Sequence, residues 1–138
     1  MEIREIKTTD YLEYKRIISQ LSKTKFNEED FKIFFNLLNK NHKIFVIESC
    51  NKLLGCGTIL IEPKLIHNMS YVGHIEDIVI DNRYRNNSLG YKIISFLIEY
   101  CSKVGCYKVI LDCKEELVNF YKKNGFEENN VGMSIYFN

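Results

Sequence analysis

The chain has 138 residues, 46% of them hydrophobic, which is enough for one domain with a core but too few for two. Its 19 Lys and Arg residues nearly balance 18 Asp and Glu residues, and a net charge of +1 argues against long-range attraction to nucleic acid or an anionic membrane. No stretch approaches the roughly 18 apolar residues that a membrane span requires. We therefore expect residues 1–138 to form a single domain without nucleic-acid or membrane partners.

The cysteines indicate the compartment. They are five in number, have no Cys-x-x-Cys spacing and lie mostly in apolar segments, which is typical of buried thiols in a reducing environment. They are Cys50, Cys56, Cys101, Cys106 and Cys113. No histidine is spaced from a cysteine pair as a metal site requires, so no metal is expected. Because residues 1–5 also lack the apolar core of a secretion signal, we expect a cytoplasmic protein.

The first elements are short and amphipathic. Residues 3–6 suggest a strand, and apolar residues recur at helical spacing over 11–21. Asn27 is a good N-cap for a second helix, with Asp30 as its third residue and an apolar face over 31–38. The order so far is therefore one strand followed by two helices.

Three strands are expected next. Residues 44–48 and 53–62 are rich in apolar and β-branched side chains and are separated by a polar tetrapeptide, so they predict a hairpin. Pro63, the only proline, ends the second of these strands. Residues 71–80 predict the next strand.

The remaining chain alternates between helix and strand. A strong helical stripe over 89–101 ends near Gly105, a plausible left-handed cap, and 107–113 predict a buried strand. A short helix over 118–125 and a last strand over 133–137 follow. The predicted order is β-α-α-β-β-β-α-β-α-β, an α/β fold with a mixed sheet and helices on both faces.

The connection from Asp81 to Ser88 precedes the longest predicted helix and carries Arg83 and Arg85. Free backbone amides at a helix N-terminus suit a pyrophosphate. The alternative is an ordinary strand-to-helix connection in which Ser88 is only the N-cap.

Several charged residues lie in apolar strand segments. Glu76 and Asp77 are adjacent carboxylates among isoleucines and valine, and their desolvation is costly unless they have a use. A period of two places Lys108 and Asp112 on one face of their strand, where a structural ion pair is the alternative to a functional role.

Two further groups are candidates for binding. Tyr121 could hydrogen-bond a leaving group, and Lys122 and Lys123 beside it could meet phosphate, although a core tyrosine and a solvated lysine face would look the same. Lys64, His67 and Lys108 could share the phosphate of a small substrate.

Four segments taken together resemble the GCN5-related N-acetyltransferase superfamily, most closely its branch that acetylates glucosamine 6-phosphate. The segments are Ile61–Asn68, Gly73–Ile78, Gly105–Cys113 and Asn119–Phe126. The resemblance covers essentially the whole chain in length and element order. It implies a homodimer whose sites are completed by the partner chain, and a place in UDP-N-acetylglucosamine biosynthesis.

The resemblance also implies a site. Acetyl-CoA would lie where the strand ending at Ile80 splays from the strand beginning near Tyr107. The implied cofactor contacts are Ile78, Val79, Ile80, Arg85, Asn86, Asn87, Ser88, Leu89, Gly90, Tyr91, Lys92, Tyr121, Lys122 and Lys123. The implied acceptor contacts are Ser22, Lys64, His67, Glu76, Asp77, Tyr107 and Lys108.

The reaction expected at this site is direct attack of the sugar 2-amino group on the thioester carbonyl, without a covalent enzyme intermediate. Glu76 or Asp112 would accept the ammonium proton, directly or through water. Backbone N–H groups near Ile78 and Val79 would polarise the carbonyl, and Tyr121 would hydrogen-bond the departing thiolate.

Three departures from the pattern leave alternatives open. Ser88 replaces the first glycine of the phosphate loop, and Leu117 replaces an asparagine that often contacts CoA. Residues 133–138 hold no arginine for the sugar phosphate, so its charge must be met by the other basic residues, or the acceptor is another small amine. A non-catalytic acyl-CoA-binding module and a protein-interaction domain are the remaining alternatives.

Overall fold

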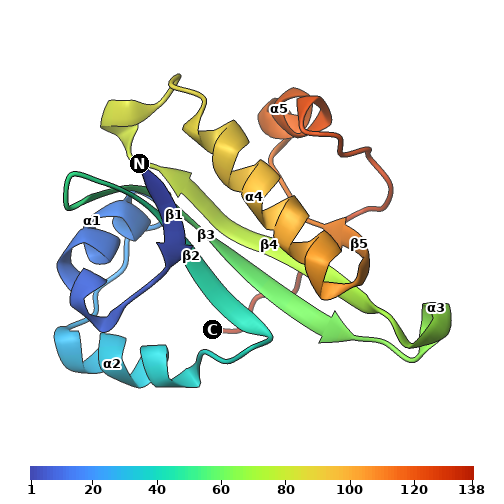
Figure 1. The fold of residues 1–138 in the computed structure, drawn as a ribbon, viewed down its shortest axis with the longest axis horizontal. Coiled ribbons are helices and arrows are strands. Elements are labelled where there is room, and N and C mark those ends of the chain that lie inside the picture. The colour runs from blue at the N-terminus through green and yellow to red at the C-terminus, as the bar shows by residue number, and fades with distance from the viewer.

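A computed structural model describes all 138 residues and contains five strands that form one sheet (Figure 1). The strands are β1 (Glu2–Glu5), β2 (His42–Ser49), β3 (Lys52–Pro63), β4 (Tyr71–Ile80) and β5 (Cys106–Ile110). The helices are α1 (Tyr11–Leu21), α2 (Glu28–Leu37), α3 (Ile66–Met69), α4 (Leu89–Val104) and α5 (Val118–Lys123). Single 3-10 turns lie at Thr8–Asp10, Asn82–Tyr84 and Glu115–Leu117.

The strands follow one another across the sheet in chain order. All neighbouring pairs are antiparallel except β4 and β5, which are parallel because α4 connects them as a crossover. The predicted mixed sheet is therefore confirmed, as is the hairpin formed by β2 and β3.

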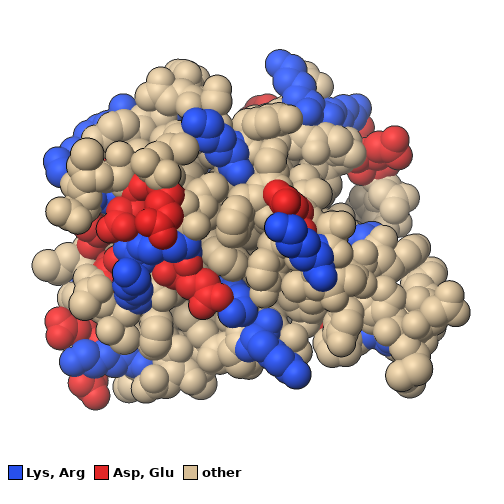
Figure 2. Space-filling view, in the orientation of Figure 1, with Lys and Arg blue, Asp and Glu red and all other residues tan.

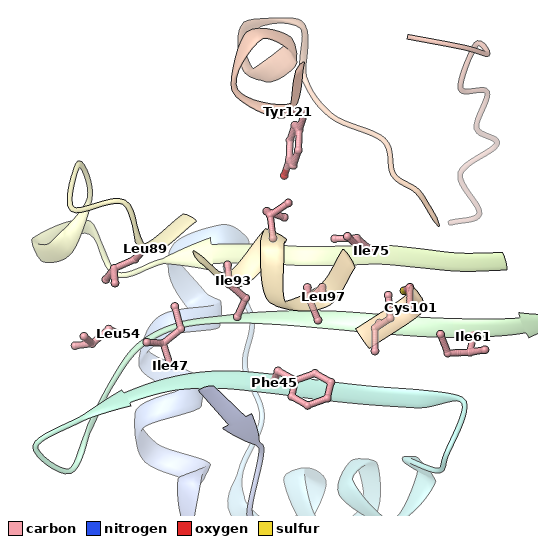
Figure 3. Close-up of a cluster of buried hydrophobic side chains, with 12 residues drawn as sticks. Phe45, Ile47, Leu54, Ile61, Ile75, Leu89, Ile93, Leu97, Cys101 and Tyr121 are labelled. Carbon is pink, nitrogen blue, oxygen red and sulfur yellow. The ribbon is translucent and has the colours of Figure 1, made fainter. Parts of the chain in front are cut away.

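Each face of the sheet is covered by helices. On one face, Ile93, Leu97 and Cys101 of α4 pack on Ile59 and Ile61 of β3 (Figure 3). On the other face, α1 and α2 cover a second cluster, in which Phe31 of α2 is buried. Because each helix has one apolar stripe, the two faces bury separate cores.

The predicted helix ends are confirmed. The Asp30 amide donates to Asn27 Oδ1 at 2.8 Å, and the Asn27 amide donates to Asp30 Oδ2 at 3.0 Å, which completes a capping box at α2. Gly105 ends α4 with φ of 98°, a conformation that glycine adopts without steric cost.

The predicted last strand is wrong, because residues 126–138 contain no regular structure. Five apolar side chains in this segment are between 83% and 93% exposed. They are Val131, Met133, Ile135, Tyr136 and Phe137. The segment passes behind the strands in Figure 1 without joining their ladder. Alternating apolar residues favour a strand, but a strand forms only where another strand pairs with it.

The strand predicted over 107–113 is shorter and less buried than expected. β5 ends at Ile110, and Tyr107 and Ile110 are exposed. β5 is an edge strand in this chain, so one side of it has no neighbour.

Charges of both signs are interleaved on the face shown in Figure 2, with no extended surface of one sign. None of the helices combines the length and apolar composition that crossing a membrane demands.

Candidate functional site

The two parallel strands separate halfway along β4. Their pairing begins at Tyr71 and Cys106 and ends at His74 and Ile110, so the second half of β4 has no partner on that side. A bulge lies in this half, because Asp77 has φ of 50° and the register with β3 shifts there. A bulge bends a strand and increases its twist, which turns the end of β4 away from β5. The predicted splayed pair is therefore confirmed.

The second half of β4 offers unpaired backbone groups on the side of the divergence. Ile78, Val79 and Ile80 lie here, and Arg85 Nε donates to the carbonyl oxygen of Ile80 at 3.0 Å. No residue of β5 pairs with these three residues. Successive amides of a strand point to opposite sides, and the Val79 amide faces β3, so only the amides that face away from β3 can meet a carbonyl entering between the strands.

The loop from β4 to α4 is anchored by a buried carboxylate. The sequence did not predict this role. Asp81 is fully buried and accepts hydrogen bonds from Arg83 Nη2 at 2.9 Å and from Arg16 Nη1 at 2.6 Å. These bonds, that from Arg83 first, hold the pKa of the Asp81 carboxyl well below its usual range. The loop therefore starts from a rigid point at the end of β4.

The N-terminus of α4 is open to an anion. Ser88 occupies the N-cap position but has φ of 63°, and its side chain makes no capping hydrogen bond. Ser88 is thus the N-cap residue by position, but its hydroxyl does not cap the helix. The first amides of a helix have no partner within the helix, so those of Leu89, Gly90 and Tyr91 remain available to a pyrophosphate.

The other predicted cofactor contacts surround this terminus in different ways. Arg85, Asn86, Asn87, Tyr91 and Lys92 have exposed side chains, whereas Leu89 is buried in the α4 core. A Cβ at Gly90 would lie 3.1 Å from Phe120 Cζ, so the glycine permits close approach of α4 and α5. Lys122 pairs with Glu128 at 3.2 Å, and Lys123 is exposed beside it.

Tyr121 points from α5 towards α4 and β4 (Figure 3). It is buried in the α4 core, and its ring packs edge-on against Phe120 and Phe126. Its hydroxyl makes no hydrogen bond within the chain and, unlike Asn124 Oδ1, is not a fully buried unpaired atom. Burial raises the pKa of this hydroxyl, and Cys113 adds to the effect. The phenol therefore stays protonated at neutral pH and can donate to a ligand.

Three carboxylates gather beside the divergence. Burial raises the pKa of the Glu76 carboxyl, and the nearby Asp77 and Asp112 carboxylates raise it further. All three residues are nevertheless exposed, and only Glu76 is partly desolvated, so the expectation of carboxylates buried inside an apolar strand is wrong. The ion pair considered for Lys108 and Asp112 is also absent, because the exposed edge strand leaves both free to be solvated.

Four of the predicted acceptor contacts line one pocket of about 180 Å³, namely Lys64, His67, Tyr107 and Lys108. The His67 ring stacks on the Tyr107 ring with centroids 3.9 Å apart. The Lys108 ammonium lies 5.9 Å from the Tyr107 centroid. A turn after β3 thus brings its basic residues to the start of β5, so that several cationic groups face one small volume.

Two polar residues of this pocket were not predicted. Glu62 and His74 also line it, and Glu62 contacts Lys64 Nζ at 3.1 Å and His74 Nε2 at 3.0 Å. Their polar side chains within otherwise apolar strands were the only available signal, because the pairing of β3 with β4 determines which residues meet.

The remaining predicted contacts lie elsewhere. Ser22 is exposed at the C-terminus of α1, and Asp77 occupies the bulge; neither lines the pocket. A second cavity of about 210 Å³ lies between α2 and the β1–β2 pair. Its charged residues Glu5 and Lys43 pair with each other, so it offers no comparable site.

Comparisons with known proteins agree with this geometry. The profile of the Acetyltransferase (GNAT) family matches residues 2–126. Glucosamine 6-phosphate N-acetyltransferase 1 of Dictyostelium discoideum is 42% identical over 128 residues, which cover 89% of this chain and 82% of the relative. The glucosamine 6-phosphate N-acetyltransferase of Arabidopsis thaliana is 37% identical over 143 residues, covering 99% of this chain and 96% of the relative.

The fold comparison covers the same range. The crystal structure of glucosamine-6-phosphate N-acetyltransferase from Arabidopsis thaliana superimposes with a TM-score of 0.95 at 37% identity, covering 99% of this chain and 98% of that one. The splayed strands, the open helix terminus and the family match over nearly the whole chain lead to one conclusion. The chain belongs to the Acetyltransferase (GNAT) family.

Proposed function

We propose that the chain transfers the acetyl group of acetyl-CoA to the 2-amino group of glucosamine 6-phosphate, releasing N-acetylglucosamine 6-phosphate and CoA. The names of its relatives support this substrate pair. The observation that carries the proposal is the separation of β4 from β5 after His74, with a basic pocket on one side of it. A non-catalytic CoA-binding module gives no purpose to that pocket.

The cofactor is proposed to bind along the second half of β4 and the start of α4. The uncapped amides of α4 fit its pyrophosphate, since neither the Ser88 hydroxyl nor another side chain occupies them. The residues proposed to contact it are Ile78, Val79, Ile80, Arg85 to Lys92, Tyr121, Lys122 and Lys123. The cofactor supplies the acetyl thioester.

The acceptor is proposed to bind in the pocket that contains Lys64, His67, Tyr107 and Lys108. Lys108 has no carboxylate partner in the chain and is the freest cation for the phosphate, whereas Lys64 is already paired with Glu62. Ser22, Glu76 and Asp77 are the proposed contacts outside the pocket.

The proton chemistry is assigned to side chains at the divergence. Glu76 is proposed to take the ammonium proton, because its raised pKa makes it a stronger base than an ordinary carboxylate; Asp112 is the second candidate. Backbone N–H groups of β4 polarise the carbonyl, and one such donor contributes about 3 kcal/mol. Tyr121 hydrogen-bonds the departing sulfur. Attack is direct, within a ternary complex.

The test is release of free CoA thiol from acetyl-CoA with glucosamine 6-phosphate or glucosamine as the acceptor. We expect rapid release with the phosphorylated sugar and at least about tenfold lower kcat/KM with glucosamine, since a charge-assisted contact is lost. Equal rates would indicate another small amine as the natural acceptor. CoA binding without turnover of any amine would support the binding-module alternative.

The active form is proposed to be a homodimer. The apolar segment from Val131 to Phe137 is exposed in the single chain, and β5 leaves one sheet edge uncovered. A monomer rarely exposes a contiguous apolar segment. In a symmetric dimer, the free edge and the apolar segment of each copy can contact those of the other. The segment also passes near the site, because a Cβ at Gly132 would lie 3.5 Å from Asp112 Oδ1.

The compartment is proposed to be the cytoplasm and the pathway to be UDP-N-acetylglucosamine biosynthesis. All five cysteines are free thiols, and Cys56 and Cys101 are buried as small apolar residues. This usage is typical of a reducing compartment.

A further inference from the structure

A histidine and a carboxylate of the acceptor pocket form a pair that has no role in the proposed acetyl transfer. His74 Nε2 lies 3.0 Å from Glu62 Oε1, while Glu62 Oε2 contacts Lys64 at 3.1 Å. These contacts, His74 first, lower the pKa of the Glu62 carboxyl, so Glu62 is an acceptor and Nε2 carries the hydrogen. No atom of the chain hydrogen-bonds Nδ1 of His74. The ring is therefore oriented by one nitrogen and free at the other.

The position of His74 in the sheet is equally specific. His74 and Ile110 are the last paired residues of β4 and β5, so His74 lies where the strands begin to separate. Alternate residues of a strand share a face, which places His74 and Glu76 on the same side of β4 before the bulge. His74 thus lies between the pocket and the proposed base.

The overall reaction requires a proton to leave the site. The acceptor enters as an ammonium; two N–H bonds and the C–S bond break, and one C–N bond forms. One of the two protons ends on the departing sulfur, and the other is left on Glu76. Glu76 is exposed in the free chain, so a relay matters only while the bound ligands separate its carboxyl group from solvent.

We propose that His74, oriented by Glu62, accepts this proton from Glu76 through Nδ1 and releases it to solvent past Glu62. The proposal rests on the assignment of Glu76 as the base. As a class, imidazoles are more basic than carboxylic acids, which makes an imidazole a suitable acceptor for a proton held by a carboxyl group. The Glu62 carboxylate then stabilises the imidazolium. His74 lines the acceptor pocket, but its role as a positioning residue for the proton requires no hydrogen bond to either substrate.

Other polar and charged groups determine the electrostatic environment of the His74 ring. Glu62 and Lys64 face it from the end of β3, His67 from the following turn, and Tyr107 and Lys108 from β5. Glu76 follows it on β4, and the Asp112 carboxylate acts on Glu76 from beyond β5. The phosphate of the acceptor offsets the lysines when it binds, which leaves Glu62 to favour the charged imidazole.

The decisive variant is His74→Gln. Glutamine can still donate a hydrogen bond to Glu62 but cannot carry a proton. We expect kcat to fall about tenfold, with KM for both substrates within about twofold of wild type, because only proton transfer is affected. His42→Gln, on β2 beside the second cavity, is the matched control and should leave both constants unchanged.

Two further measurements separate a relay from a structural role. In His74→Ala, added imidazole should restore kcat in proportion to its concentration, and it should not accelerate the wild type. The shape of the wild-type kcat profile against pH should change in His74→Gln, because one group that carries the proton is removed.

The outcomes also distinguish the two proposals. If Glu76→Gln slows catalysis but His74→Gln does not, or if imidazole gives no rescue, the relay is overturned and the base assignment stands. If Glu76→Gln leaves kcat unchanged, the base assignment fails and the relay fails with it.

Discussion

Tyr121 combines a buried ring with a hydroxyl that has no partner in the chain. Phe120 and Phe126 surround the ring, so its orientation is determined by packing and not by a hydrogen bond. Because burial raises the pKa of the hydroxyl, it remains a donor throughout the neutral range. A donor held in this way loses little conformational freedom when a thiolate forms beside it.

Removing this hydroxyl tests its role. Tyr121→Phe should lower kcat by about a hundredfold, the lower end of general acid catalysis, with little change in KM for the sugar. Steady-state kinetics check this, and thermal unfolding should show an unchanged fold because the ring is retained. An unchanged kcat would remove Tyr121 from the chemistry.

Lys108 tests the assignment of the pocket to the phosphate. Lys108→Ala should raise KM for the sugar phosphate by about ten- to a hundredfold, because a charge-assisted contact of about 1.5–3 kcal/mol is lost. KM for acetyl-CoA should hardly change. Lys103→Ala, an exposed residue of α4 that pairs with Glu99, is the control and should alter neither constant. Equal losses for both ligands would indicate misfolding.

At the scale of elements, the start of α4 depends on backbone conformations that cost energy. Asn86 and Ser88 both have positive φ, with values of 71° and 63°. A left-handed residue other than glycine costs about 1–2 kcal/mol. Glycine adopts this conformation without the cost, so the chain carries strain at Ser88 that a glycine would avoid.

Glycine at this position should relieve that strain. Ser88→Gly should stabilise the protein by about 0.5–1 kcal/mol, the net of relieved strain and greater freedom of the unfolded chain. Denaturant unfolding measures the change, and KM for acetyl-CoA should stay equal or fall. The matched control is Ser102→Gly within α4, where glycine should destabilise by a similar amount. Destabilisation by Ser88→Gly would show that its side chain is needed.

The anchor of the same loop gives a pH-dependent prediction. Asp81→Asn should destabilise the fold by about 2–3 kcal/mol at pH 7, since two guanidinium groups lose a buried partner. The pKa of Asp81 is lowered in the folded protein, so its contribution is present above the ordinary value of about 4 and is lost as pH falls further. Urea unfolding at pH 7 and pH 3 checks this. A difference from wild type that does not shrink at pH 3 would contradict it.

At the scale of the whole molecule, the sheet ends at β5 while apolar residues of the C-terminal segment stay exposed. Neither feature has a partner within the chain. Both are explained together if two copies of the chain contact each other across this edge.

The oligomeric state tests this arrangement. Ile135→Asp combined with Phe137→Asp should convert the protein to a monomer and lower its activity, because charge on these side chains opposes their burial. Light scattering after size-exclusion chromatography measures the mass. Leu12→Asp, an exposed apolar residue of α1, is the control and should not change the mass. A monomeric wild type would contradict the proposal.

Most helices and strands could be predicted from residue patterns within short segments of the chain. Asn27, Pro63 and Gly105 each act within a few residues of chain, so the caps and the strand end could be predicted from the sequence. The strand over 133–137 was wrong because pairing depends on a distant partner that alternation does not reveal. The basic residues of the pocket could each be predicted from the sequence. Glu62 and His74 were missed because only the β3–β4 register brings them together.

The sequence by itself determined the longer helices, the β2–β3 hairpin and the family of this protein, since periodicity, caps and motif order are properties of short segments. Only the tertiary structure decided where β4 leaves β5, which cations share a pocket and which end of the chain stays uncovered. The physical reason is that these features depend on contacts between residues far apart in the chain, whose free energy no local pattern contains.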